Sequence, residues 1–223
     1  RMSRFVHDRV IFAGDAAHLV SPFGARGCNG GVADADNLAW KLSAVLAGAP
    51  AGLIDTYNEE AVITADENIL NSTRSTDFMT PKSEASLALR NAVLALAADH
   101  AFARPFVNSG RLSTPVHYPE GALTACDRDA WEGGIAPGSP AIDAWLGDGW
   151  LLPRLGGEWK LLTARPLEGV SLPVVVVEDE AARSRYELTA SAAYLLRPDQ
   201  YVAARWKHFT PHHLEDSPWA RFA

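Results

Sequence analysis

The stretch Arg9-Val-Ile-Phe-Ala-Gly-Asp-Ala-Ala-His18 decides the fold of this chain. Its apolar, partly β-branched run over residues 9–13 is typical of a strand that is buried on both faces, as in a parallel sheet. The run ends in Gly14 and Asp15, and a glycine-rich loop over residues 19–31 follows before a patterned helix. In α/β folds, ligand sites form where a buried strand ends and a loop leads into a helix. The sequence therefore predicts an α/β fold with a ligand site at this loop.

Composition and charge exclude several classes of function. The 223 residues carry a formal net charge of -7, and the positive charges are scattered, which predicts no nucleic-acid partner. No apolar run has the length of a transmembrane helix, which predicts no membrane partner. Cys28 and Cys126 lie far apart and form no Cys-x-x-Cys pair. This cysteine usage favours a reducing, cytoplasmic location and predicts no metal site built on cysteines.

Three helices are predicted after the loop, over residues 32–46, 55–70 and 84–100. The third carries apolar residues at helical spacing, among them Leu89 and Leu96, and is expected to bury them. These helices complete the first part of the predicted fold.

A second unit is predicted beyond a connecting segment. Residues 104–140 are rich in glycine and proline and lack periodicity, so this long connection is expected to be pinned to a surface. Four short strands follow, over residues 159–164, 173–177, 191–196 and 201–206. The last two flank the turn sequence Arg197-Pro-Asp-Gln200 and are predicted to form a hairpin. Trp145, Trp150 and Trp159 are expected to fill the core of this unit.

Each part of the Gly-Asp motif has a physical role. Gly14 lets the backbone approach a ligand closely, and the Asp15 carboxylate can accept hydrogen bonds from the vicinal hydroxyls of a sugar or polyol. The following helix directs its positive end into the same space, which favours an anionic or carbonyl group by about 0.3–1 kcal/mol. Four loop glycines leave their amide groups uncovered: Gly24, Gly27, Gly30 and Gly31.

This motif resembles the second flavin-binding motif of the FAD-dependent aromatic hydroxylases, which are single-component flavin monooxygenases. The resemblance is nearly continuous over residues 9–42 and rests on Gly14-Asp-Ala-Ala-His18, Pro22, Gly27, Asn29, Gly30 and Asp34-Ala-Asp-Asn-Leu-Ala-Trp-Lys-Leu42. The second unit is similar to the thioredoxin-like C-terminal domain of the phenol hydroxylase branch, which includes 3-(3-hydroxyphenyl)propionate hydroxylases and aromatic polyketide hydroxylases. That similarity rests on Pro137-Gly-Ser-Pro140, Gly149-Trp-Leu-Leu152, Trp159-Lys-Leu-Leu162 and Leu196-Arg-Pro-Asp-Gln-Tyr-Val-Ala203.

The resemblance implies a monooxygenase that hydroxylates a phenolic or other aromatic substrate with FAD as cofactor, NADPH as co-substrate and O2. It implies that Asp15 binds the ribityl chain, that Pro22 lines the pocket near the reactive face of the flavin, and that the backbone around Cys28 and Asn29 contacts the pyrimidine edge. The helix start at Gly30 and Gly31 would stabilise negative charge on reduced flavin. The full predicted cofactor-binding set is Gly14, Asp15, Pro22, Gly27, Cys28, Asn29 and Gly30. No residue is assigned to catalysis or to a metal.

The resemblance also implies how the chain is divided. Residues 1–103 are expected to be the C-terminal part of an FAD-binding domain, residues 104–140 a connecting segment, and residues 141–223 a thioredoxin-like α/β domain without Cys-x-x-Cys. The Gly-x-Gly-x-x-Gly that cradles the FAD pyrophosphate is missing from the sequence. We therefore expect the chain to be the C-terminal part of a longer protein, and to hold no FAD and be inactive on its own.

Other interpretations stay open from the sequence. The thioredoxin-like unit could be a non-catalytic module for dimerisation or assembly, which would make the protein a homodimer, and the Gly-Asp motif is shared with other flavoenzyme classes. His18 is interpreted as a structural histidine bonded to backbone, and Asp34 as a residue placed near a helix start by the helix dipole. The remaining candidates are three histidines near the C-terminus, which could in principle bind a metal: His208, His212 and His213.

Overall fold

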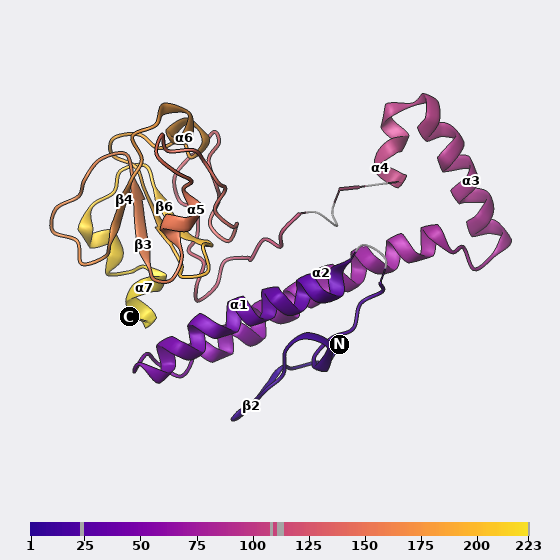
Figure 1. Ribbon diagram of the computed structural model, residues 1–223, viewed down its shortest axis with the longest axis horizontal. Coiled ribbons are helices and arrows are strands. Elements are labelled where there is room, and N and C mark those ends of the chain that lie inside the picture. The colour runs from indigo at the N-terminus through magenta and orange to yellow at the C-terminus, as the bar shows by residue number, and fades with distance from the viewer. Residues whose placement is uncertain (23–24, 108, 111–113, 223) are drawn as a thin grey trace. The chain divides into compact units, whose positions relative to one another are not determined.

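The computed structural model describes residues 1–22, 25–107, 109–110 and 114–222. The chain divides into two compact units and mixes helices with strands (Figure 1). Unit 1 is Arg1–Asn37 with Tyr57–Val116, and unit 2 is Leu38–Thr56 with His117–Ala223. None of the helices in the described ranges is long and apolar enough to cross a membrane.

Unit 1 begins with a small hairpin. Strand β1 (Val6–His7) pairs antiparallel with strand β2 (Val10–Ile11), and the Val10 side chain is 56% exposed. The expectation of a strand buried on both faces over residues 9–13 is therefore wrong. Within the described residues only β1 pairs with β2, so the apolar side chains of β2 have no second strand and no full layer to pack against.

The two long helices begin or end outside their predicted bounds. Helix α1 (Arg26–Leu46) begins at Arg26 rather than at residue 32, and helix α2 (Leu53–Met79) ends at Met79 rather than at residue 70. Glycine is unfavourable inside a helix, which is why the pattern indicated a loop where the first turns of α1 lie.

Polar contacts between α1 and α2 show that the two helices run antiparallel in unit 1. Arg26 donates from Nη1 to Asn68 Oδ1 over 3.0 Å. Asn37, farther along α1, donates from Nδ2 to Glu60 Oε2 over 2.7 Å, and Glu60 precedes Asn68 on α2. The two helices therefore form the scaffold on which the N-terminal segment of unit 1 rests.

Helix α3 (Glu84–Asp99) begins where the sequence predicts and is capped by Ser83, whose hydroxyl accepts from the Ser86 amide over 3.1 Å. Its expected burial is wrong, because none of its residues is buried and Leu89 is 67% exposed. The apolar pattern formed a helix, but the described residues supply no surface that covers it. Two short helices follow it, η2 (Ala101–Ala103) and α4 (Arg104–Val107).

Unit 2 contains a mixed four-stranded sheet in the order β4-β3-β5-β6. Strand β3 is parallel to β4 and antiparallel to β5, and β5 forms an antiparallel hairpin with β6. All four predicted strands and the predicted hairpin are thus confirmed. The strands are β3 (Lys160–Thr163), β4 (Val174–Val176), β5 (Ala193–Leu196) and β6 (Val202–Trp206). The short helices of the unit are α5 (Leu152–Leu155), α6 (Glu180–Arg185), η4 (Pro211–Leu214) and α7 (Pro218–Phe222).

Both faces of this sheet are covered, which explains why β5 is buried at every position. Leu161 and Leu195 belong to the apolar cluster on one face, whereas Leu162 and Leu196 belong to the cluster on the other. This alternation is the period of two that a pleated strand imposes. A bulge interrupts it in β6, since Leu195 pairs with Ala204 and Leu196 with Val202.

The tryptophans do not all fill this core. Trp145 and Trp150 are 51% and 54% exposed, so the expectation that they are core residues is wrong. They pack edge to face on one another with ring centroids 5.5 Å apart. Trp159 is half-buried and packs against the cluster that contains Leu161.

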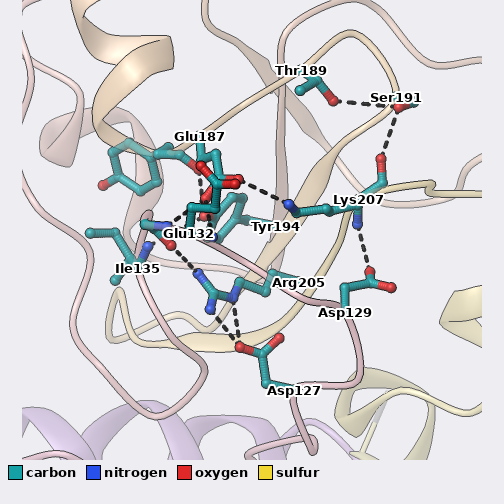
Figure 2. A network of polar contacts seen from close by, with 12 residues as sticks. Asp127, Asp129, Glu132, Ile135, Glu187, Thr189, Ser191, Tyr194, Arg205 and Lys207 are labelled. Atoms are coloured by element: carbon teal, nitrogen blue, oxygen red, sulfur yellow. Dashed lines mark hydrogen bonds and ion pairs between the residues drawn. The ribbon is translucent and has the colours of Figure 1, made fainter.

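The connecting segment is fastened to the sheet by charged side chains (Figure 2). Asp127 Oδ2 accepts from Arg205 Nη2 over 2.5 Å, and Asp129 Oδ2 accepts from the Lys207 amide over 2.7 Å. Glu187 accepts from two backbone amides of the same segment and pairs with Lys207 over 3.0 Å. This part of the connection is therefore pinned to a surface, as its length predicts.

Candidate functional site

The β1–β2 hairpin is held in unit 1 by polar side chains of α2. Asn58 Oδ1 accepts from the backbone amides of Phe5 and Val6, over 2.7 and 3.2 Å. The hydroxyl of Tyr57, which is fully buried, donates to the Phe12 carbonyl over 2.8 Å. These three bonds fix the segment that leads into the Gly-Asp turn.

The turn itself is a single 3₁₀ turn, η1 (Gly14–Ala16). Gly14 has φ 57°, a left-handed conformation that glycine adopts without strain, and its carbonyl accepts from the amides of Ala17 and His18. Asp15 is exposed, and its carboxylate makes no hydrogen bond or ion pair within the described residues. A carboxylate held this way on a rigid turn is available to hydrogen-bond a ligand.

Asp34 is the site residue that sequence reasoning missed. It lies inside α1 rather than near its start, and it is buried. Its Oδ2 accepts from the Gly14 amide over 2.8 Å and from His18 Nε2 over 2.7 Å. His18 therefore bonds to a carboxylate rather than to backbone. Burial, and to a lesser degree the charge of Asp34, raises the pKa of Tyr57 above its usual range.

Three of the predicted cofactor residues lie in the first turn of α1: Gly27, Cys28 and Asn29. The first four amide groups of an α-helix have no partner inside the helix, so this turn offers donors to a ligand. Cys28 and Asn29 are exposed, and Asn29 Nδ2 donates back to the Ala25 carbonyl over 2.9 Å.

The other predicted residues are placed differently. Gly30 is buried in α1, so the expected helix start at Gly30 is wrong. Pro22 is exposed in the turn that precedes α1, and its carbonyl accepts from the Ala25 amide over 3.3 Å. Gly24 lies outside the described residues. The structure thus brings Gly14 and Asp15 onto one turn, and Gly27, Cys28 and Asn29 onto the first turn of α1.

A cavity of about 960 Å³ lies in unit 2 and is lined by none of the predicted flavin-binding residues. The C-terminal histidines line it, but His212 pairs with Glu215 over 2.8 Å and His213 caps Thr210. In the part of the chain that the structure describes, no group of histidine, cysteine and carboxylate side chains could hold a metal ion.

The comparisons with known proteins agree with the Gly-Asp motif. The FAD binding domain family matches residues 1–72. A flavin-dependent monooxygenase of Mycobacteroides abscessus is 32% identical over 90% of this chain and 38% of its own length. Tetracenomycin A2 monooxygenase-dioxygenase of Streptomyces glaucescens is 33% identical over 88% of this chain and 38% of its own length.

A solved structure of the rebeccamycin biosynthetic enzyme RebC with reduced flavin is similar over 98% of this chain, with a TM-score of 0.74 and 26% identity. The match covers 46% of that chain, so the present chain spans less than half the length of these relatives. The family match, the identities and the shared fold confirm the resemblance that the Gly-Asp motif carries. The chain is thus similar, over nearly its whole length, to part of the FAD-dependent aromatic hydroxylases and monooxygenases.

Proposed function

We propose that this chain forms part of an FAD-dependent monooxygenase that hydroxylates a phenolic or polyketide-type aromatic substrate, with NADPH as co-substrate. Asp15 binds the ribityl hydroxyls of FAD in this proposal, and the first turn of α1 binds the flavin ring. The observation that carries it is the exposed Asp15 carboxylate, which has no partner among the described residues and lies on a turn held by hydrogen bonds to the Gly14 amide and carbonyl.

The residues present fit this cofactor. A carboxylate accepts hydrogen bonds from two neighbouring hydroxyls, and Asp15 is free to do so among the described residues. Gly27, Cys28 and Asn29 place small or short side chains over helix amides that lack intrahelical partners. A helix N-terminus favours the negative charge that reduced flavin carries.

In this proposal the cofactor and the residues of the chain have different tasks. FAD, when bound, supplies the redox and oxygen chemistry of the reaction. The residues of this chain bind and orient the cofactor: Asp15 fixes the polyol, Pro22 and the first turn of α1 border the ring, and the α1 dipole stabilises negative charge. The polyketide part of the proposal is supported by the name of one relative, which reads "Putative polyketide hydroxylase" and comes from Streptomyces halstedii.

The test is the FAD affinity of the full natural protein that contains this chain. Asp15→Ala is expected to raise the dissociation constant for FAD about 10- to 150-fold, because hydrogen bonds to a charged group contribute about 1.5–3 kcal/mol. Equilibrium dialysis or quenching of flavin fluorescence measures this constant.

Asp8→Asn is the matched control, since it removes an exposed carboxylate from the neighbouring hairpin turn, where the residue has φ 55°. FAD affinity is expected to stay within twofold in the control. An Asp15→Ala protein that binds FAD as tightly as the wild type would remove the assignment of Asp15. NADPH and NADH consumption by the wild-type holoprotein, measured side by side, tests the co-substrate.

We propose a second role in assembly. It is assigned to residues 141–223, for which the thioredoxin-like fold is a prediction. Trp145 and Trp150 expose their side chains next to one another in unit 2, and exposed apolar patches of this kind mark interfaces. If the protein is a homodimer through this patch, the Trp145→Ser, Trp150→Ser double variant is monomeric in size-exclusion light scattering. A wild-type protein that is already monomeric, or a variant that stays dimeric, rejects this role.

A further inference from the structure

One buried carboxylate oxygen of α1 joins this helix to η1 and to the residue two positions after it, His18. Asp34 Oδ2 accepts from the Gly14 amide over 2.8 Å and from His18 Nε2 over 2.7 Å. The side chains of Asp34 and His18 are 1% and 2% exposed. An ionised carboxylate only accepts hydrogen bonds, so Nε2 of His18 carries the hydrogen of this bond.

Glycines allow the turn and α1 to meet without side chains between them. A Cβ added at Gly14 would lie 3.7 Å from the Gly31 Cα, and a Cβ added at Gly31 would lie 3.7 Å from the Gly14 Cα. A Cβ added at Gly30 would lie 3.3 Å from His18 Cε1, tighter than most real contacts. The backbone of the turn is thus packed directly against the helix that carries Asp34.

His18 uses only one of its ring nitrogens in this arrangement. Its Nδ1 is buried and has no hydrogen-bond partner among the described residues. Its ring stacks on Phe5 with centroids 5.7 Å apart. A buried ring that leaves one nitrogen unsatisfied incurs a desolvation cost. The contribution of His18 to this site is therefore its hydrogen bond to Asp34, and this bond orients the Asp34 carboxylate toward Gly14.

We propose that Asp34 is a positioning residue for the flavin-binding carboxylate. By holding the Gly14 amide, Asp34 fixes the turn from which Asp15 projects, and His18 holds Asp34 in the orientation that this requires. The proposal rests on the proposed function of Asp15. It assigns to Asp34 no contact with FAD, so every effect of Asp34 on FAD binding must pass through Asp15.

A double-mutant cycle on FAD affinity in the full natural protein tests this dependence. Asp34→Leu, similar in size but unable to accept hydrogen bonds, is expected to weaken FAD binding at least tenfold. Asp34→Asn is expected to stay within threefold of the wild type, because an amide oxygen in the place of Oδ2 can accept both bonds. In an Asp15→Ala background, Asp34→Leu is expected to cause less than a twofold further loss.

Asp36→Leu is the matched control, since it removes an exposed carboxylate from the same helix. If Asp34→Leu does not fold, His18→Phe serves in the same cycle, because it keeps the stacked ring and removes the Nε2 donor. Additive losses from Asp34→Leu and Asp15→Ala, or no loss from either the Asp34→Leu or the His18→Phe variant, overturn the proposal.

A second measurement separates this proposal from the proposed function. Amide hydrogen exchange at Gly14 in the protein without FAD reports the Asp34 bond directly, and is expected to be at least tenfold faster in Asp34→Leu than in Asp34→Asn. Unchanged FAD affinity in Asp15→Ala with faster Gly14 exchange in Asp34→Leu would reject the flavin role of Asp15 but keep the positioning of Gly14 by Asp34. Unchanged Gly14 exchange in Asp34→Leu would reject that positioning role itself.

Discussion

Two turns of this protein each carry an aspartate and each receive a side chain from α1, but they treat the aspartate in opposite ways. In unit 1, Asp34 of α1 holds the Gly14 amide, and Asp15 is left exposed and unpaired among the described residues. In unit 2, Trp40 of α1 donates from Nε1 to Asp199 Oδ2 over 2.9 Å, and Arg197 pairs with the same carboxylate over 2.6 Å.

The difference shows which carboxylate serves structure and which is open to a ligand. The side chains of Arg197 and Asp199 are 0% and 1% exposed, and the guanidinium lies 5.3 Å from the Tyr201 ring centroid. The two charged side chains of that turn are buried and paired with each other, so they lock the hairpin. The Gly-Asp turn is held by hydrogen bonds to the Gly14 backbone, and its own acidic side chain takes no part in them.

The largest expected effect comes from breaking the inward turn. Arg197→Ala leaves Asp199 buried without its cation, and removal of one partner of a buried pair costs about 3–5 kcal/mol. Urea unfolding followed by tryptophan fluorescence measures the loss. Arg128→Ala, at an exposed arginine of the same unit, is the control and is expected to change stability by less than about 0.5 kcal/mol. A loss of less than about 1 kcal/mol for Arg197→Ala would contradict the locking role.

The next prediction compares two leucines, one in a strand and one in a helix, that both belong to apolar patterns in the sequence. Leu195 is fully buried in β5, so Leu195→Ala is expected to cost about 2–5 kcal/mol. Leu89 is 67% exposed on α3, so Leu89→Ala is expected to change stability by less than about 0.5 kcal/mol. Both variants are compared in this chain by urea unfolding. Similar losses would show that α3 packs against a surface that the described residues do not provide.

The hairpin of unit 2 was predictable because everything that specifies it is local. The apolar runs have strand length, the Arg-Pro-Asp-Gln turn separates them, and Gln200 adopts φ 64° to close it. A hairpin needs no knowledge of distant partners to be recognised. The strands that pair with β3 lie farther away in the chain, so the sequence predicted the strands themselves but not their pairing.

The site of unit 1 was only partly predictable, because its contacts join residues that local patterns cannot connect. The identity of Gly14 and Asp15 as a ligand-binding pair followed from the motif, whereas the partner of Gly14 lies twenty positions away at Asp34. Asp34 was interpreted as a charge near a helix start, but α1 begins at Arg26 and Asp34 lies inside it. The signal that could have found it is the pair Gly30-Gly31, which predicts close backbone approach to α1.

The exposed turn can also be strained through its backbone. Gly14→Ala places a side chain at φ 57°, a left-handed conformation that costs about 1–2 kcal/mol. Gly52→Ala is the control, because an added Cβ there meets nothing within 4 Å and its φ is not left-handed. Differential scanning calorimetry compares the two. Equal stability of both variants would show that the Gly14 conformation is not required.

The smallest effect concerns Glu187, a carboxylate that is intermediate between Asp15 and Asp199 because it is partly exposed yet paired (Figure 2). Hydrogen bonds from Lys207 and from the Gly133 amide lower the pKa of Glu187. Its contribution to stability is therefore present above the unfolded-state pKa of about 4.3 and is lost as pH falls through the lower folded-state pKa. Urea midpoints of Glu187→Gln are expected to fall less steeply than those of the wild type on the acid side. The Glu168→Gln control, at an exposed loop residue, should keep the wild-type slope. If Glu187→Gln also keeps the wild-type slope, the contacts of Glu187 with the connecting segment do not favour its charged form.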